Sequence, residues 1–360
     1  MTPNPYILTF EACEAGSHSQ VGGKCASLGA MIQAGAPVPP GFAITTTAYQ
    51  NMLNTNNLSE CIHVWLARLN PEDVRTEEKY SHTIRKLIEE TGIAPEIEEA
   101  IRAGYEALCR RAGLSDVPVA VRSSATAEDL PGYSFAGQQD TYLWVMGADA
   151  VVEHVRKCWS SLYTARAISY RHDNSFAHEK VLMGVGVQKM VNAKAAGVAM
   201  TLNPINGDRS KIAIDSSWGL GEAVVGGEVT PDNFLIDKVI FEVVNRVISP
   251  KHIEFVADQA NGRVIEREVE PERQTQSSLT EAEIVAVAKM AKRAEKFYGC
   301  PQDVEWAIDA DLPPPDNVVI LQSRPETVWS QKERSRISAG HATGIAGVVD
   351  TLISGVRIKK

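Results

Sequence analysis

A chain of 360 residues is too long for one minimal domain and fits one large α/β unit or two to three subdomains. Hydrophobic residues make up 44% of it and charged residues 22%, which is typical of soluble proteins that bury a core. The 36 basic and 45 acidic side chains give a formal net charge of −9, which argues against binding to duplex nucleic acid or to an anionic membrane. A bound nucleotide would therefore have to meet a local basic cluster.

Cysteine usage and the N-terminus bear on the compartment. The six cysteines form no C-x-x-C motif, and none joins the eight histidines at metal-ligand spacing. This pattern indicates a reducing compartment and no structural zinc. The first ten residues lack a basic segment followed by an apolar core, and no run of about 18 apolar residues occurs. We therefore expect a cytoplasmic protein without a membrane span.

The N-terminal half predicts a few strands beside a helical layer. Alternation predicts strands over 6–10 and 42–45, and the sequence of 22–35 predicts a loop, a helix and a glycine stop. Apolar residues recur at three-to-four spacing over 48–112, which is therefore mostly helical. Further strands are expected over 117–121 and 141–145, followed by helical residues over 150–170.

Strands dominate the C-terminal half. The pattern predicts them over 181–190, 197–202, 211–216, 234–236, 241–247, 304–308 and 318–321. Thr280 and Glu283 form a capping signature, which predicts a helix that continues through Tyr298. The residues from Trp329 onward are less patterned. A stripe of apolar residues at helical spacing near residue 350 makes this tail a candidate docking segment.

The segment from Val119 to Thr141 combines an apolar strand, Arg122 and a loop of small residues. Small side chains leave room for an anion against the backbone N–H groups, and the arginine adds a permanently charged, multidentate donor. A phosphate-binding loop is one interpretation of this segment. A surface loop with a salt-bridged arginine is the other, and the segment alone does not decide between them.

Two common nucleotide-binding motifs are excluded. A Walker A loop ending at Gly23-Lys24 would need glycine in place of His18 and a hydroxyl residue in place of Cys25. The glycine-rich segment that begins at Trp218 has Val224 where a dinucleotide-binding fingerprint needs its third glycine. Any phosphate chemistry must therefore depend on residues dispersed along the chain.

The dispersed candidates include a possible metal site. Glu305 and Gln322 lie on consecutive predicted strands, where alternation can bring both side chains to one face as oxygen ligands for Mg²⁺. Arg324 would then meet the terminal phosphate. Each candidate also has a simpler interpretation: Lys24 can be solvated at a helix start, Glu305 can be a strand-edge charge, and Gln188 and Met190 can be ordinary strand residues.

Several motifs occur together and in order. They are V-G-G-K-x-A-S-L-G (21–29), P-V-P-P-G-F (37–42), V-R-S-S-A-T-A-E-D (121–129), F-A-G-Q-Q-D-T (135–141), Q-K-M-V (188–191), N-P (203–204), W-G-L-G-E (218–222), D-V-E-W (303–306) and L-Q-S-R-P (321–325). The set closely resembles the nucleotide-binding portion of the phosphoenolpyruvate synthase and pyruvate, phosphate dikinase family. The resemblance covers about residues 5 to 328. Each motif alone is weak, whereas the ordered set is highly specific.

The resemblance implies an α+β chain with an ATP-grasp-type fold, in which two subdomains clamp ATP and Mg²⁺. We assign 1–190 to the N-terminal subdomain, with the helical layer and the phosphate-binding loop. We assign 191–328 to the C-terminal subdomain, with the metal site, and 329–360 to the tail.

The resemblance also implies roles for individual residues. Lys24 and Arg122 would bind phosphates, and Arg324 would stabilise the transferring phosphates. The other implied ligands are Gly137, Gln138 and Thr141 in a glycine-containing cover, Arg166 as a further phosphate contact, Gln188, Met190 and Val191 at the adenine, and Glu305 and Gln322 at Mg²⁺.

The sequence departs from the family in one respect. Family members cleave ATP to AMP and phosphate and pass the β-phosphoryl group to a histidine on a swivelling domain, for which this sequence offers only an echo around His341. We therefore expect that histidine, and the acceptor-substrate site, on a partner subunit. Such a free-standing component most resembles the ATP-binding (beta) subunit of phenylphosphate synthase, which would phosphorylate phenol.

Two alternatives remain open. The chain can be the ATP-binding component of a split phosphoenolpyruvate synthase or of a system similar to rifampin phosphotransferase. It can also be a non-catalytic ATP-sensing subunit, although the joint presence of Lys24, Arg122, Glu305, Gln322 and Arg324 argues against this.

Overall fold

The computed structural model describes residues 4–69, 74–127, 140–174, 176–258 and 261–329. The chain up to Glu326 forms one compact unit, and a second unit runs from Thr327 to Lys360. The first unit combines antiparallel sheets with helices, so the α+β class predicted from the sequence is confirmed. No helix in the described part of the chain is long and apolar enough to cross a membrane.

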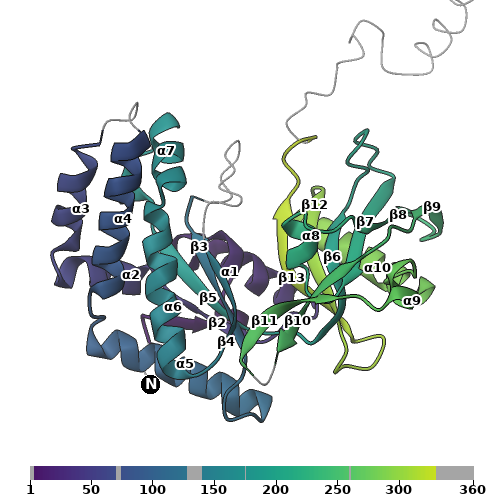
Figure 1. Ribbon diagram of the computed structural model, residues 1–360, viewed down its shortest axis with the longest axis horizontal. Coiled ribbons are helices and arrows are strands. Elements are labelled where there is room, and N and C mark those ends of the chain that lie inside the picture. The colour runs from purple at the N-terminus through teal and green to yellow at the C-terminus, as the bar shows by residue number, and fades with distance from the viewer. Residues whose placement is uncertain (1–3, 70–73, 128–139, 175, 259–260, 330–360) are drawn as a thin grey trace, which may run out of the picture. The chain divides into compact units, whose positions relative to one another are not determined.

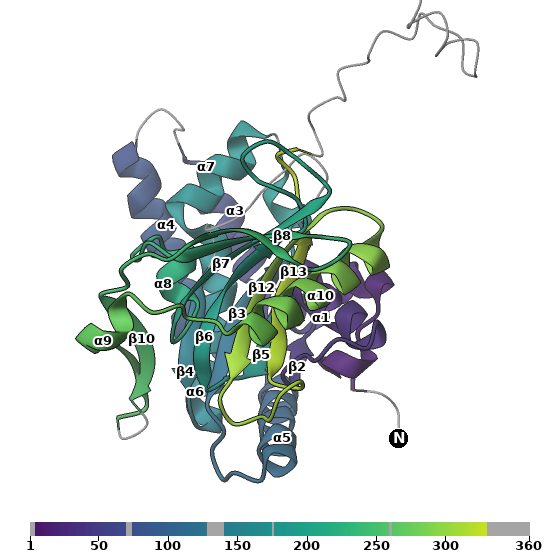
Figure 2. The same ribbon diagram turned by 90° about the vertical axis from the view of Figure 1, so that its right-hand side faces the viewer.

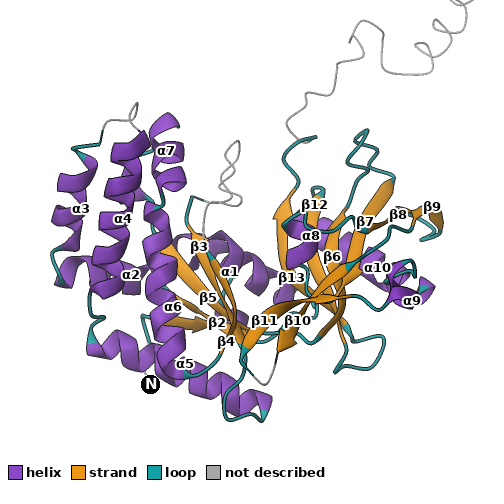
Figure 3. Ribbon diagram, in the orientation of Figure 1, coloured by secondary structure: helices purple, strands orange, loops and turns teal. Residues whose placement is uncertain are grey.

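The first sheet has five strands and a helical layer on one side (Figures 1 and 3). In spatial order its strands are β1 (Ile7–Thr9), β2 (Gly41–Ile44), β5 (Met183–Lys189), β3 (Val119–Ala125) and β4 (Thr141–Val145). The layer contains α2 (Thr46–Thr55), α3 (Leu58–Leu66), α4 (Val74–Glu90), α5 (Pro95–Ala112), α6 (Ala148–Ser160) and α7 (Ala165–Asp173). One continuous apolar core joins these helices to alternate residues of the strands, including Val119 and Val121 of β3.

The second sheet has six strands, and its first strand along the chain follows soon after β5. In spatial order they are β13 (Val318–Pro325), β12 (Gln302–Asp309), β6 (Ala193–Met200), β7 (Lys211–Trp218), β8 (Asp232–Asp237) and β9 (Val243–Val247). Helix α10 (Glu281–Tyr298) lies across β12 and β13 (Figure 2), and its N-terminus carries the predicted capping box of Thr280 and Glu283. The predicted subdomain boundary at residue 190 falls in the connection between the two sheets.

Helix α1 (His18–Gln33) belongs to both halves of the unit. Its N-terminal part packs on the first sheet, where Val21 and Cys25 share an apolar cluster with Phe10. Its C-terminal part contributes Met31 to the core beneath the second sheet. In addition, the Ser27 hydroxyl donates to a backbone oxygen of β13 at 2.5 Å. This helix therefore ties the two sheets together.

A hairpin that the sequence analysis did not identify follows β9. It consists of β10 (Ile253–Asp258) and β11 (Arg263–Glu268), which pair only with each other among the described strands. The Asn261-Gly262 dipeptide before β11 is a typical hairpin signal that could have revealed it. Gly219, in the segment excluded as a dinucleotide loop, has φ 71°, and a Cβ there would lie 2.3 Å from the Phe255 oxygen of β10, so this position requires glycine.

The remaining elements are short. They are the α-helices α8 (Glu222–Val225) and α9 (Pro271–Gln274) and the 3₁₀ helices η1 (Phe10–Ala12), η2 (Ala15–Ser17), η3 (Ser161–Tyr163) and η4 (His178–Lys180).

The sequence-based boundaries of several elements were wrong, and two of these differences bear on the site. Strand β3 does not end before Arg122 but continues to Ala125, because the residues from Arg122 to Ala125 pair with β5. Ladder hydrogen bonds to this neighbour outweigh the loop preference of the serines. Likewise, α1 begins at His18 rather than after the glycines, with a break inside it at Gly22 (φ 76°, ψ 172°).

His178, in η4, is packed against a buried arginine of α7. The Arg171 Nε donates to His178 Nδ1 at 2.8 Å, and the Arg171 side chain is 1% exposed. Burial, together with the positive charge of Arg171, lowers the pKa of His178 to about 4. The imidazole is therefore neutral in the folded protein at neutral pH.

We expect His178 to reduce stability in acid. The unfolded chain takes up the His178 proton near pH 6.5, whereas the folded chain takes it up only near pH 4, so stability falls as the pH is lowered through this window. Thermal unfolding of the wild type and of His178→Gln at several pH values would measure this effect as a shallower slope in the variant. His82→Gln, at an exposed position, is the control, and equal slopes in all three proteins would contradict the expectation.

Candidate functional site

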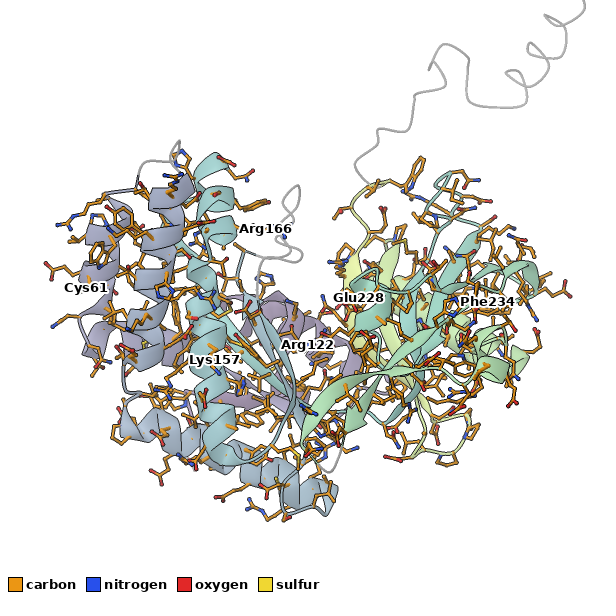
Figure 4. The ribbon with its side chains drawn as sticks, in the orientation of Figure 1. Cys61, Arg122, Lys157, Arg166, Glu228 and Phe234 are labelled. Atoms are coloured by element: carbon orange, nitrogen blue, oxygen red, sulfur yellow. The ribbon has the colours of Figure 1, made fainter. Side chains whose placement is uncertain are left out.

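Arg122 is the residue at which the two sheets meet through side-chain hydrogen bonds (Figure 4). From β3, its Nη2 donates to Glu305 Oε2 at 2.9 Å and to Gln322 Oε1 at 3.3 Å, while its Nη1 donates to the Leu321 oxygen at 2.9 Å. The Arg122 and Glu305 side chains are only 17% and 25% exposed. The Nε of Arg122 is buried without a partner among the described residues. One N–H donor of the guanidinium is therefore available to a ligand.

Glu305 and Gln322 face each other across neighbouring strands. Glu305 of β12 is the register partner of Gln322 of β13, so both side chains project from the same face of the sheet. A bulge directly after Glu305, before Trp306, interrupts the regular pairing. Two oxygen-bearing side chains thus converge on the Arg122 guanidinium, as the alternation of the predicted strands allowed.

The next register pair on this face is Asp303 and Arg324. Arg324 contacts Asp303 Oδ2 with Nε at 2.8 Å and with Nη2 at 2.7 Å. Burial raises the pKa of Asp303, and the charge of Arg324 opposes that rise. Asp303 Oδ1 is buried without a partner among the described residues. Sequence reasoning missed Asp303, although its position two residues before Glu305 on one strand was the signal.

Lys24 reaches the same strand as Arg122 from helix α1. Its Nζ donates to the Ser123 oxygen at 3.1 Å, and the Cys25 N–H donates to Ser124 Oγ at 3.2 Å. This close approach depends on Gly22, where a Cβ would lie 1.8 Å from the Ser124 oxygen. Gly22 of the V-G-G-K motif thus lets the helix place its lysine against the strand that carries Arg122.

Of the three residues expected at adenine, Gln188 and Met190 lie further along the same face, whereas Val191 packs with residues of the second sheet. Gln188 of β5 is the register partner of Ala120, two residues before Arg122 on β3. Gln188 is buried, and its Nε2 donates to the Pro39 oxygen at 3.4 Å. Met190 and Val191, directly after β5, are also buried. The predicted adenine end and the predicted phosphate end therefore occupy successive positions along one pair of strands.

The remaining predicted residues are placed less centrally or not at all. Thr141, the first residue of β4, is the exposed register partner of Arg122. Arg166 is exposed in the first turn of α7, and Figure 4 shows it apart from Arg122. Gly137 and Gln138 lie outside the described residues. The glycine-containing cover thus stays a prediction.

The oxygen donors on this face fit a hard divalent cation. Mg²⁺ prefers oxygen ligands and takes one or two protein carboxylates together with phosphate oxygens. Glu305 and Gln322 provide such oxygens, and the unpaired Oδ1 of Asp303 provides another nearby on the same face. No cluster of three or more His, Cys, Asp or Glu side chains suited to a metal occurs among the described residues. Mg²⁺ held by these side chains would complete its coordination with phosphate oxygens and water.

Three cationic side chains, those of Lys24, Arg122 and Arg324, lie near hard oxygen ligands, a combination that suits a nucleotide polyphosphate. Comparison with known proteins also points to nucleotide binding. A family model described as pyruvate phosphate dikinase, AMP/ATP-binding domain matches residues 18–344. The chain belongs to this family. The family resemblance inferred from the motifs is therefore confirmed, whereas the closer likeness to phenylphosphate synthase stays a prediction.

Curated relatives give the same family assignment. The chain is 44% identical over 338 residues to a protein named probable phosphoenolpyruvate synthase from Staphylothermus marinus, a match that covers 88% of this chain and 40% of that protein. It is 42% identical to the phosphoenolpyruvate synthase of Aeropyrum pernix, covering 87% of this chain and 41% of that one. For the phosphoenolpyruvate synthase of Pyrococcus furiosus the identity is 40%, covering 91% and 44%. The chain thus spans less than half the length of these relatives.

The close approach at Gly22 can be tested against a matched glycine. Gly22 and Gly35 both have positive φ, 76° and 73°, but an added Cβ meets nothing within 4 Å at Gly35. We expect Gly35→Ala to cost about 1 kcal/mol from backbone strain, and Gly22→Ala to cost roughly 1–3 kcal/mol more, because Ser124 must move and because the Gly22 ψ of 172° lies in a region essentially confined to glycine. Urea unfolding measures both costs. Equal losses in the two variants would show that the contact with Ser124 is unimportant.

Proposed function

We propose that this chain is the ATP-binding component of a phosphoenolpyruvate synthase-type dikinase, which converts ATP to AMP and phosphate and passes the β-phosphoryl group to a histidine. The observation that carries the proposal is the convergence of Arg122 with Glu305 and Gln322, with Arg324 one register pair away. The family membership and the names of the relatives support it.

The proposed chemistry depends on positioning and charge rather than on a protein nucleophile in this domain. In phosphoryl transfer, negative charge spreads over the equatorial oxygens, and cations and N–H donors around them lower the barrier. Lys24 and Arg122 would hold the phosphates along β3, and Arg324 would face the phosphate that is transferred. Mg²⁺, when bound, would neutralise phosphate charge from Glu305 and Gln322.

An arriving phosphate would change the partners of Arg122. Its Nη1 and Nη2 already donate hydrogen bonds to the second sheet, while its buried Nε has no partner among the described residues. Arginine holds phosphate well because it offers several donors in one plane. We infer that Arg122 would bind phosphate with Nε and Nη2, which would leave the Glu305 carboxylate available to hold Mg²⁺.

The final acceptor is the finer part of the proposal. The names of the relatives favour pyruvate, so the alternative stated from the sequence is better supported than phenol. We propose that the accepting histidine belongs to a separate domain, carried by a partner subunit, and that this domain delivers the phosphoryl group to the acceptor. ATP and an acceptor, with water, would then yield AMP, phosphate and the phosphorylated acceptor.

Removing the side chain of Glu305 or Arg324 should slow catalysis strongly. We expect Glu305→Ala and Arg324→Ala to lower the rate of AMP formation by roughly 10²–10³-fold, because Arg324 would contact the reacting phosphates and Glu305 would hold the Mg²⁺ that neutralises them. Steady-state release of AMP from ATP by the chain and its histidine-bearing partner measures the rate.

The matched control is Arg246→Ala on the outer strand β9, where Arg246 pairs with the exposed Glu281. This variant removes an arginine–glutamate pair between the same sheet and helix α10 and should keep wild-type turnover. Thermal unfolding verifies that all variants are folded. Wild-type turnover in Glu305→Ala or Arg324→Ala would refute the assignment of these residues.

The acceptor can be identified with ATP labelled at the β-phosphate. We expect label to appear on the partner's histidine together with AMP, and to be discharged by pyruvate. Discharge by phenol but not by pyruvate would instead establish the phenylphosphate synthase interpretation. ATP binding with no AMP and no labelled protein in the presence of the partner would mean that the chain is a nucleotide-binding subunit without catalytic activity.

A further inference from the structure

Trp144 occupies an unusual place in the first sheet. It has a positive φ of 59°, a backbone region that bulky side chains rarely adopt. The register explains the conformation: Val119 pairs with Val145 and Val121 with Tyr142, so Leu143 and Trp144 together oppose one residue of β3, Ala120. This bulge directs Trp144 to the face of the sheet that carries Ala120.

That face is the one that carries the candidate nucleotide site. Ala120 and Arg122 alternate with the core residues Val119 and Val121 along β3, so their side chains share a face. Gln188 is directly opposite Ala120 on β5. Residues two apart on a strand are separated by about 6.6 Å. Ala120 is therefore one such step from Arg122, and Trp144 lies opposite Ala120 on the neighbouring strand β4.

The indole lies in an apolar cluster built from both halves of the unit. Trp144 is 6% exposed and packs with Ala120 and Met190, and partly buried side chains of Leu220, Ala257 and Val264 surround them. Ala257 and Val264 belong to the β10–β11 hairpin, and β11 contacts β4. The hairpin, which follows the first sheet in the sequence, thus places apolar side chains beside Trp144.

The polar atom of the indole has no partner. Trp144 Nε1 is buried and makes no hydrogen bond to any described residue. The same is true of Trp159 and Trp306, so an orphaned indole N–H is not by itself a sign of a site. Trp144 differs from Trp159, which lies in the core under the helical layer, because it belongs to the cluster that contains Met190.

We propose that Trp144 is a base-recognition residue of the nucleotide site, whose ring packs against the purine and whose Nε1–H donates to an acceptor atom of the nucleoside. The inference rests on the proposed ATP-binding function and adds to it a determinant of base affinity. The apolar cluster excludes water from the base, which strengthens that hydrogen bond. The bulge fixes the indole before the nucleotide arrives, so little side-chain entropy is lost on binding.

The test separates the base from the phosphates. Calorimetric titration with ATP and with tripolyphosphate, each with Mg²⁺, gives two dissociation constants for the wild type and for Trp144→Phe. Phenylalanine keeps an aromatic ring but removes the N–H donor, so we expect the dissociation constant for ATP to rise roughly tenfold. Binding of tripolyphosphate should stay within about twofold, because Lys24 and Arg122 hold the phosphates.

Trp159→Phe is the matched control, since it also removes a buried indole N–H without a partner, but in the helical-layer core. It should leave both dissociation constants unchanged. An unchanged affinity for ATP in Trp144→Phe, or an equal loss of ATP and tripolyphosphate affinity, would overturn the inference while leaving the proposed function intact. Failure of the wild type to bind ATP would instead refute the proposed function itself.

Discussion

The charge of Arg122 is the constraint on which the site depends. A guanidinium that is only 17% exposed needs acceptors, and the second sheet provides them through Glu305, Gln322 and the Leu321 oxygen. These acceptors are the same oxygens that suit a divalent cation. A phosphate and a metal arriving together would replace one balanced arrangement of charges with another. The contact between Arg122 and these oxygens would therefore couple anion binding to metal binding.

The position of that charge is set by features away from it. Strand β3 keeps Arg122 in register because it pairs with β5 through Ala125, and Gly22 lets α1 approach β3 closely enough for Lys24 to bond the next residue. On the other side, the pairing of β12 with β13 places Glu305 opposite Gln322. Two independently paired strand systems therefore determine one contact.

Much of this could be read from the sequence, and the failures have physical reasons. Alternation and capping identified most strands and the start of α10, and alternation also predicted that Glu305 and Gln322 could share a face. The end of β3 could not be read, because Ser123 and Ser124 favour turns locally and only pairing with β5 makes them extended. The side of the sheet that Trp144 faces depends on a bulge, and the alternation of apolar residues in a single sequence does not reveal a bulge. Asp303 was missed because its partner Arg324 was assigned to phosphate instead.

The bond between Ser27 and the Ser323 oxygen also bears on how the protein is made. These residues are 296 positions apart, and the helix that carries Ser27 contributes to both apolar cores. At ribosomal elongation rates, roughly 15–60 s separate the synthesis of α1 from that of β13. During that interval the apolar side of α1 that later covers the second core has no strand to pack on. Until β13 is made, this side of α1 is exposed hydrophobic surface of the kind that makes folding intermediates prone to aggregate.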